Sequence, residues 1–263
     1  MLELEPCSGC SGTAEVDARW SDLPLLVCFF VAGLIDSVAF DLYSCFVNMQ
    51  TGNTIFIGLG VSGQPDNLPG KAWLRCLLAI IFFAIGTLFF SSLHRWFGPR
   101  RRWVLITSFL AQAISVGIVA LLVTAGIVRD GHDGRTNTQK DGYIITRVQD
   151  SFPRSDFVPI ALLAFQSAGQ AIASRALGFG SLPTIVLTSL YCDLMSDAEL
   201  FTASVCANSY RNRRVGGIVL FLAGAVTGGF LSKSGTGFGG TLWIASSLKL
   251  CISFCWCTWK SKL

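Results

Sequence analysis

The chain has 263 residues, of which 52% are hydrophobic and 14% are charged, and its formal net charge is +4. Soluble domains carry about 25% charged residues, so a soluble globule is disfavoured. The apolar content is too high for a disordered chain, and ten cysteines are too dilute in this length for a secreted disulfide scaffold. The class that remains is a polytopic membrane protein.

Six apolar blocks are long enough to cross a bilayer. A hydrocarbon core of about 30 Å needs about 20 helical residues. The alternation of polar and apolar residues that an outer-membrane barrel needs is absent, so we expect helices. The blocks are residues 24–43, 72–93, 103–128, 157–177, 215–231 and 238–259. The predicted fold class is therefore an all-α polytopic membrane protein with about six transmembrane helices.

Two further apolar segments, residues 46–61 and 181–195, are shorter and more polar. Each directly follows a full-length block. Irregular backbone is tolerated at membrane depth only where protein or a water-filled cavity satisfies its polar groups. We therefore expect two short broken or re-entrant segments.

The order of these elements predicts an internal repeat. Thr51 and Thr188 lie 137 residues apart, and Phe-x2-Gly-x6-Leu occurs at Phe83 and again at Phe221, 138 residues later. Each half then contains a span, a short polar segment and two more spans. The predicted organisation is a disordered cytoplasmic leader at 1–22, a first repeat at 23–128, a joining loop at 129–156, a second repeat at 157–259 and a tail at 260–263.

Six or eight crossings remain open from the sequence, depending on whether the short segments cross. Six crossings with both termini inside place the basic clusters at 95–102 and 211–214 on the cytoplasmic face, as the positive-inside rule expects. They also leave the five basic residues of 129–156 outside, whereas eight crossings leave Arg100–Arg102 outside. Because the five basic residues of the loop are matched by five Asp, we favour six crossings.

Several motifs resemble a known family. Gly33-Leu34-Ile35-Asp36-Ser37 and the segment Met49-Gln50-Thr51-Gly52-Asn53-Thr54 are similar to the "G-x-x-D-A" and "M-T-G-N-T" signatures of the YoaK family, membrane proteins of bacteria and fungi. In the second half, Gln170, Arg175, Leu177 and Gly178 resemble its "Q-N-A-x-x-R-x-L-G" stretch, and Pro183–Thr188 its "P-T-T-V-L-T-G" stretch. Ala171-Ile172 and Ser189 depart from these patterns. The resemblance implies an integral membrane protein with about six spans and no established substrate.

Asp36 and Arg175 are charged residues inside predicted spans. A carboxylate at a span centre costs about 2.5–3.5 kcal/mol on insertion scales, so Asp36 should face a partner or a cavity. It could couple transport to protons or cations, or it could be a structural anchor. Arg175 is near a block end, where snorkelling to the interface is the usual outcome and pairing with Asp36 or a solute is the alternative.

The segment Thr51–Thr54 combines a permissive glycine with side chains that donate and accept hydrogen bonds, which suits an unwound turn at a binding site. Short interrupted segments at matching places in two halves are typical of a transporter's binding site. The alternative is a helix cap or a packing turn. The candidate substrate-binding or ion-binding residues are Asp36, Asn48, Thr51, Gly52, Asn53, Gln170, Arg175, Thr184 and Thr188.

Other function classes lack their motifs. Cys7 and Cys10 form a lone thiol pair without further zinc ligands at recognisable spacing, so we expect no metal. No phosphate loop, zinc-protease helix or nucleophile elbow is present, so we expect neither a cofactor nor enzymatic activity. The arginine runs are topology signals, and no nucleic-acid partner is expected.

The prediction is a small-solute permease or secondary carrier whose two polar segments form the site. The alternative is a non-transporting membrane scaffold or accessory protein, in which the same polar residues lock helices together. The expected partners are the lipid bilayer and an unknown small solute, and the chain could also form homo-oligomers. The expected location is the plasma membrane or an organelle membrane, as a multi-pass protein.

Overall fold

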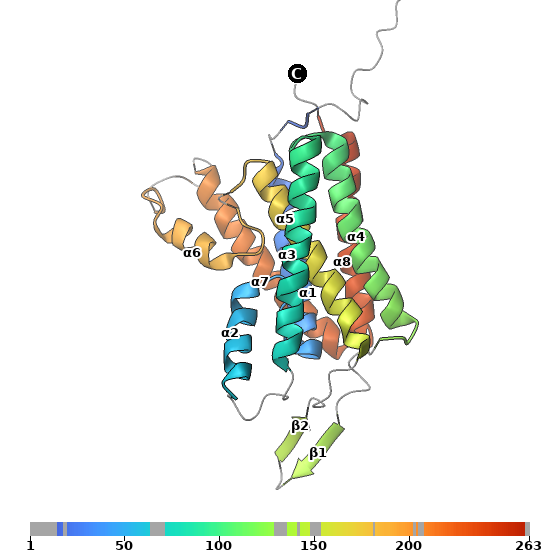
Figure 1. Cartoon of the computed structure of the whole chain (residues 1–263). Coiled ribbons are helices and arrows are strands. Elements are labelled where there is room, and N and C mark those ends of the chain that lie inside the picture. The colour runs from blue at the N-terminus through green and yellow to red at the C-terminus, as the bar shows by residue number, and fades with distance from the viewer. Residues whose placement is uncertain are drawn as a thin grey trace, which may run out of the picture.

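The computed structural model describes residues 15–17, 20–63, 72–128, 136–140, 143–147, 154–180, 182–201, 204 and 208–260. Within these residues the chain forms a bundle of α-helices with a two-stranded antiparallel hairpin at one end (Figure 1). The helices are α1 (Asp22–Tyr43), α2 (Gln50–Val61), α3 (Ala72–Phe97), α4 (Arg102–Thr124), α5 (Phe157–Ala176), α6 (Leu187–Met195), α7 (Ser209–Lys233) and α8 (Gly237–Thr258). The hairpin pairs β1 (Thr136–Lys140) with β2 (Tyr143–Arg147), and the 3-10 helix η2 (Arg154–Asp156) leads into α5.

Six of these helices are long and apolar enough to cross a membrane, namely α1, α3, α4, α5, α7 and α8. The predicted all-helical architecture with about six spans is confirmed. The two predicted short segments are the helices α2 and α6, with 12 and 9 residues. At 1.5 Å per residue they measure about 18 and 14 Å, well short of a bilayer core of about 30 Å. Neither can cross, so the eight-span alternative fails on length.

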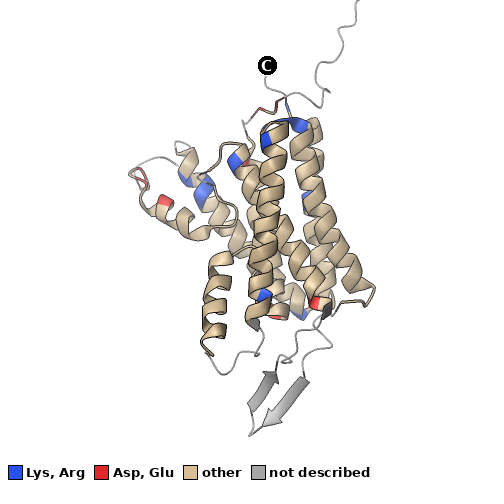
Figure 2. Ribbon diagram, in the orientation of Figure 1, with Lys and Arg blue, Asp and Glu red and all other residues tan. Residues whose placement is uncertain are grey.

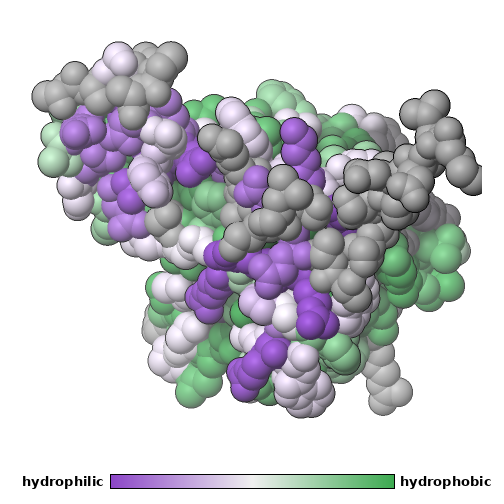
Figure 3. Space-filling view, turned by 90° about the horizontal axis from the view of Figure 1, so that it is seen from above, coloured by the Kyte–Doolittle hydropathy of each residue, from purple (hydrophilic) through white to green (hydrophobic). Residues whose placement is uncertain are grey.

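Both ends of the described chain lie at the same end of the bundle. The backbone N–H of Val16 donates to the carbonyl of Arg100, and that of Asp17 donates to the carbonyl of Lys260. Val16 and Asp17 of the predicted leader are thus bonded to residues that follow α3 and α8. Charged residues gather toward the ends of the bundle (Figure 2), and a view from above shows hydrophilic side chains on that face and hydrophobic ones around the rim (Figure 3).

This arrangement predicts the sidedness of the chain. The hairpin lies at the end of the bundle opposite to the C-terminus (Figure 1). An epitope tag inserted between Lys140 and Tyr143 and a tag after Leu263 should lie on opposite sides of the membrane, with the C-terminal tag facing the cytoplasm. Protease protection of sealed membranes measures this, and two tags on the same side would contradict the six-span topology.

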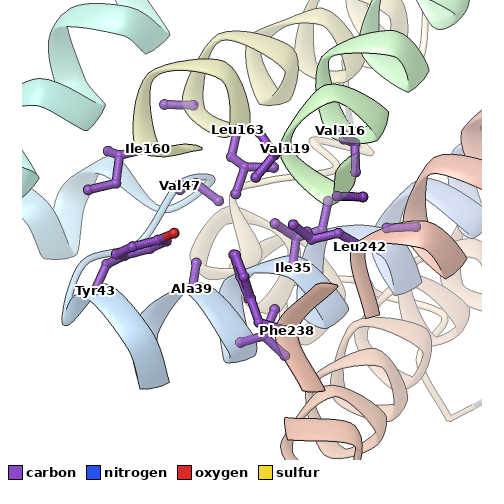
Figure 4. Packing of buried hydrophobic residues seen from close by; sticks show 14 of the residues in the cluster. Ile35, Ala39, Tyr43, Val47, Val116, Val119, Ile160, Leu163, Phe238 and Leu242 are labelled. Atoms are coloured by element: carbon purple, nitrogen blue, oxygen red, sulfur yellow. The ribbon is translucent and has the colours of Figure 1, made fainter. Parts of the chain in front are cut away.

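The centre of the bundle is an apolar cluster to which α1, α4, α5 and α8 all contribute. Figure 4 shows Ile35 and Tyr43 of α1 packed near Val116 of α4, Leu163 of α5 and Phe238 of α8. The Tyr43 and Phe238 rings meet edge to face at 5.6 Å. α3 and α7 are the least buried of the six long helices, and their outer faces carry exposed apolar side chains such as Leu88 and Phe230. These faces suit contact with lipid.

Glycines let pairs of helices approach to backbone contact. A Cβ on Gly224 of α7 would lie 2.0 Å from the Phe30 carbonyl oxygen of α1, and a Cβ on Gly86 of α3 would lie 2.5 Å from the Phe165 carbonyl oxygen of α5. Because lipid offers no hydrophobic drive between helices, close packing of small residues is a main source of association. Gly228, four residues after Gly224, also faces α1, because a Cβ there would lie 2.8 Å from the Leu34 carbonyl oxygen.

Gly224→Ala is expected to lower the free energy of unfolding by about 1–3 kcal/mol, the usual cost of overpacking, because the new methyl group meets backbone rather than a movable side chain. Gly229→Ala, on the same helix, is the matched control because a Cβ there meets nothing within 4 Å. The control should be neutral or stabilising by up to about 1 kcal/mol through helix propensity. Unfolding in one detergent measures both variants, and equal effects would contradict the close approach of α1 and α7.

Candidate functional site

The chain after α1 folds back into the bundle, and Asp36 holds the returning segment. Ser44 ends α1 in a left-handed conformation with φ of 55°. Residues 45–49 then return to the level of Asp36, which lies about two turns before the end of the helix. The buried Asp36 Oδ1 accepts hydrogen bonds from the backbone N–H groups of Val47 and Asn48, both at 2.9 Å. The carboxylate thus caps the chain that leads into α2.

The same segment is tied to the second half of the protein. Ser167 Oγ of α5 donates to the Val47 carbonyl oxygen at 2.9 Å. Asn48 is buried, and its Nδ2 donates to the Ala32 carbonyl oxygen of α1 at 3.2 Å. Residues 47–48, which we call the buried turn, therefore lie between α1 and α5.

The side chain of Asn53 forms hydrogen bonds with residues just before α2 and in its first turn. Its Oδ1 accepts from the Phe46 N–H at 2.9 Å, and its Nδ2 donates to the Phe46 carbonyl oxygen at 2.6 Å and to Gln50 Oε1 at 2.8 Å. These bonds use the side chain within the turn, as the alternative of a structural cap predicts. Gly52 lies against the Phe46 ring, and Thr51 points to the exposed side of α2.

The second short segment brings one predicted residue into the interior. Thr184 is fully buried, and its Oγ1 has no hydrogen-bond partner among the described residues, whereas Thr188 is exposed. The two short segments approach each other through apolar side chains, because Met49 before α2 packs in the same cluster as Leu182 and Leu187 around α6. The threonines Thr51 and Thr54 of α2 and Thr188 of α6 are exposed and take no part in this cluster.

Gln170 and Arg175 lie on the same helix and have different surroundings. Gln170 is buried in α5, and its Oε1 accepts a hydrogen bond from Lys249 Nζ of α8 at 2.9 Å. Arg175 is exposed in the last turn of α5 and makes no ion pair with Asp36. The structure therefore favours snorkelling for Arg175 and does not bring it to Asp36.

Arg175→Ala is expected to be nearly neutral for stability, because an exposed arginine keeps its water in the folded protein. Its effect should add to that of Asp36→Ala within about 0.5 kcal/mol, as expected for side chains that do not touch. Unfolding free energies of the wild type, both single variants and the double variant test this. A coupling above about 1 kcal/mol would contradict the separation.

Two ion pairs and a buried lysine involve charged residues that the sequence motifs did not indicate. Arg75 of α3 and Asp156 of η2 form a buried ion pair at 3.2 Å, and Arg213 of α7 pairs with Asp22 of α1 at 2.8 Å. Lys249 is fully buried in α8. A lone lysine within an apolar block was a usable signal, because a charge inside a span needs a partner or a cavity.

Four buried side-chain oxygens in α1, the buried turn, α5 and the segment before α6 are among those that lack hydrogen-bond partners within the residues that the structure describes. Native proteins leave few such atoms, so they mark places where a water, an ion or a solute can bind. Among the described residues no group of three or more His, Cys, Asp or Glu could hold a metal ion, and Cys7 and Cys10 lie outside this part of the chain. The four atoms are Asp36 Oδ2, Asn48 Oδ1, Gln166 Oε1 and Thr184 Oγ1.

Six long apolar helices around a buried polar turn define a multi-pass α-helical membrane protein. The chain belongs to the family described as "Protein of unknown function (DUF1275)", whose family model matches residues 24–255. This agrees with the YoaK-like motifs in both halves. Comparisons with curated proteins and with solved structures found no match.

Proposed function

We propose that this protein is a permease or secondary carrier for a small solute, with its site at the buried turn. The observation that carries the proposal is the pair of hydrogen bonds from the Val47 and Asn48 N–H groups to Asp36, which hold non-helical backbone inside the bundle. Irregular backbone at membrane depth is tolerated where it is buried in protein or lines a cavity, and broken helices are typical of transporter sites. The oxygens of Asp36, Asn48 and Thr184 that find no hydrogen-bond partner in the described part of the chain would bind the solute.

The packing of the helices supports two inverted halves that could move against each other. α1 packs on α7, α3 packs on α5, and α4 packs on α8. In the two halves α1 corresponds to α5, α3 to α7 and α4 to α8. An exchange of the halves therefore turns the α1–α7 pair into the α3–α5 pair and leaves the α4–α8 pair unchanged. Arg213 follows Arg75 by 138 residues, the same offset as between Gly86 and Gly224, and each arginine pairs with an aspartate next to the first helix of the opposite half.

We infer from this correspondence a pseudo-two-fold axis in the plane of the membrane, as in carriers built from inverted repeats. The buried turn would change its surroundings when the halves rock, because Asp36 belongs to the first half and Ser167 to the second. In this proposal no residue has a catalytic role.

The alternative remains a membrane scaffold or accessory protein. It is favoured by the hydrogen bonds of Asn53, which are all made within its own turn. In a scaffold the polar groups would serve only to lock α2 against α1. Measured flux separates the two functions, because a scaffold has no path for solute.

Flux should be measured by light scattering of reconstituted vesicles challenged with urea, glycerol or sodium formate. We expect the wild type to pass at least one probe faster than protein-free vesicles. Thr184→Val, which removes a hydroxyl without changing its volume, should slow that flux. Thr107→Val is the matched control, because Thr107 is exposed on α4 and bonds only within its own helix. No flux of any probe through folded protein would favour the scaffold.

A further inference from the structure

Lys249 is a buried lysine in the middle of α8 that the proposed site does not use. It lies near the centre of this helix of 22 residues and is fully buried between helices. A charged side chain at the centre of a span is costly and marks functional sites more often than structural ones. The surroundings of its ammonium group therefore decide what the residue can do.

The partners of Lys249 are neutral. Its Nζ donates to Gln112 Oε1 of α4 at 2.8 Å and to Gln170 Oε1 of α5 at 2.9 Å. An ammonium group has three N–H donors, so these two bonds leave one N–H without a hydrogen-bond acceptor in the described part of the chain. Lys249 forms no ion pair with any residue that the structure describes, unlike Arg75, Arg213 and Arg214, which pair with aspartates.

The amide groups around Lys249 also leave donors unused. Gln170 is 1% exposed, and its Nε2 has no hydrogen-bond partner among the described residues. Gln112 Nε2 makes only a long contact of 3.4 Å to Ser108 Oγ. Because both amide oxygens accept from Lys249, the amide nitrogens remain as donors beside the ammonium. The cluster of Lys249, Gln112 and Gln170 thus offers positive charge and N–H groups, with its amide oxygens already used.

The backbone around this cluster is adapted to hold it. Gly169 of α5 faces the Gln112 amide, and a Cβ at this position would lie 2.7 Å from Gln112 Nε2. The glycine therefore makes room for the glutamine between α4 and α5. Three helices contribute to the cluster, and two of them belong to the second half of the chain.

We propose that the cluster of Lys249, Gln112 and Gln170 binds a small monovalent anion of the size of formate or nitrate. The anion supplies the negative charge that the described residues leave out, and it accepts hydrogen bonds from Lys249 Nζ and Gln170 Nε2. A cation is disfavoured because it would be repelled by the positive charge of the Lys249 ammonium. That this anion is the transported solute is a second step, which rests on the proposed function.

Binding is tested by thermal unfolding of the purified full chain in detergent. Sodium formate or sodium nitrate replaces sodium gluconate at constant ionic strength. A ligand that binds only the folded state must raise Tm. The wild type should gain several degrees, and Lys249→Met should gain none. Lys260→Met, which removes an exposed lysine just beyond α8, is the matched control and should respond as the wild type does.

A second variant keeps the test decisive if Lys249→Met does not fold. Gln170→Glu retains an oxygen for Lys249 and places a carboxylate next to it, so the protein carries its own anion. This variant should fold without added formate and should not respond to it. Formate responses equal to that of the wild type in Lys249→Met or Gln170→Glu, or no response of the wild type to either anion, would overturn the proposal.

Flux measurements separate this inference from the proposed function. Formate flux that is lost in Gln170→Glu would support both. Glycerol flux through a protein that binds neither formate nor nitrate would overturn the anion site and leave the carrier intact. Formate binding that depends on Lys249, without flux of any probe, would support the site and contradict the carrier.

Discussion

Replacing Asp36 with alanine is expected to lower the free energy of unfolding by about 2–6 kcal/mol. The change removes the oxygen that accepts from both Val47 and Asn48, and each buried N–H left without a partner costs about 1–3 kcal/mol. The buried turn would then lose its attachment to α1. Unfolding of the purified protein in one detergent measures the loss.

Asp36→Asn is the matched control for this change. The amide keeps an acceptor oxygen for the two N–H groups but removes the charge, and charge-assisted hydrogen bonds are about twice as strong as neutral ones. We therefore expect a smaller loss of stability than for alanine. If Asp36 couples transport to protons or cations, the asparagine variant should fold and have no flux. If the Asp36→Asn variant folds and keeps its full flux, Asp36 has a structural role and does not couple transport to an ion.

Breaking the Arg75–Asp156 pair should have a comparable effect. The two side chains are 3% and 1% exposed, and removal of one partner from a buried ion pair costs about 3–5 kcal/mol because it leaves an uncompensated charge. Arg75 also donates to the Tyr43 carbonyl oxygen, so its loss frees the end of α1 as well. Arg75→Ala and Asp156→Ala should each destabilise strongly, and the double variant should be less destabilised than their sum.

Unfolding free energies of the four proteins measure this coupling, with Arg213 and Asp22 as the comparison. In that pair the Arg213 side chain is 26% exposed, so water screens its charge and the single changes should cost less. Additive effects at Arg75 and Asp156, within about 0.5 kcal/mol, would contradict their contact. Equal costs at the two pairs would contradict the difference in burial.

Much of the membrane architecture could be predicted because the thickness of the bilayer sets the number of consecutive apolar residues that a transmembrane helix needs. The six spans follow from the lengths and positions of the apolar blocks. The short segments at 46–61 and 181–195 were expected because polar residues interrupt apolar stretches there. The positive-inside rule also predicted that the arginine clusters at 95–102 and 211–214 lie at the same end of the bundle. These features are local, so each can be recognised without knowing which helices meet.

The partners of individual side chains could not be predicted in the same way. Asp36 was recognised as a charge in a span, but its acceptance from Val47 and Asn48 requires that the chain turn back after Tyr43. Asn53 has the composition of a binding residue and is used by its own turn. A sequence pattern identifies a residue that needs a partner, whereas only the folded chain decides whether the protein provides one.

The sequence by itself determined the membrane class, the six long apolar blocks, the positions of the two short segments and the family resemblance, whereas the lengths of α2 and α6 in the structure decided against eight crossings. Only the tertiary structure decided that Arg75 pairs with Asp156 and that Lys249 meets Gln112 and Gln170. These contacts join residues 79–137 positions apart, and they depend on the rotation of each helix about its axis. Nearly uniform apolar helices carry little sequence signal for that rotation, so close glycine contacts and a few buried polar groups decide it.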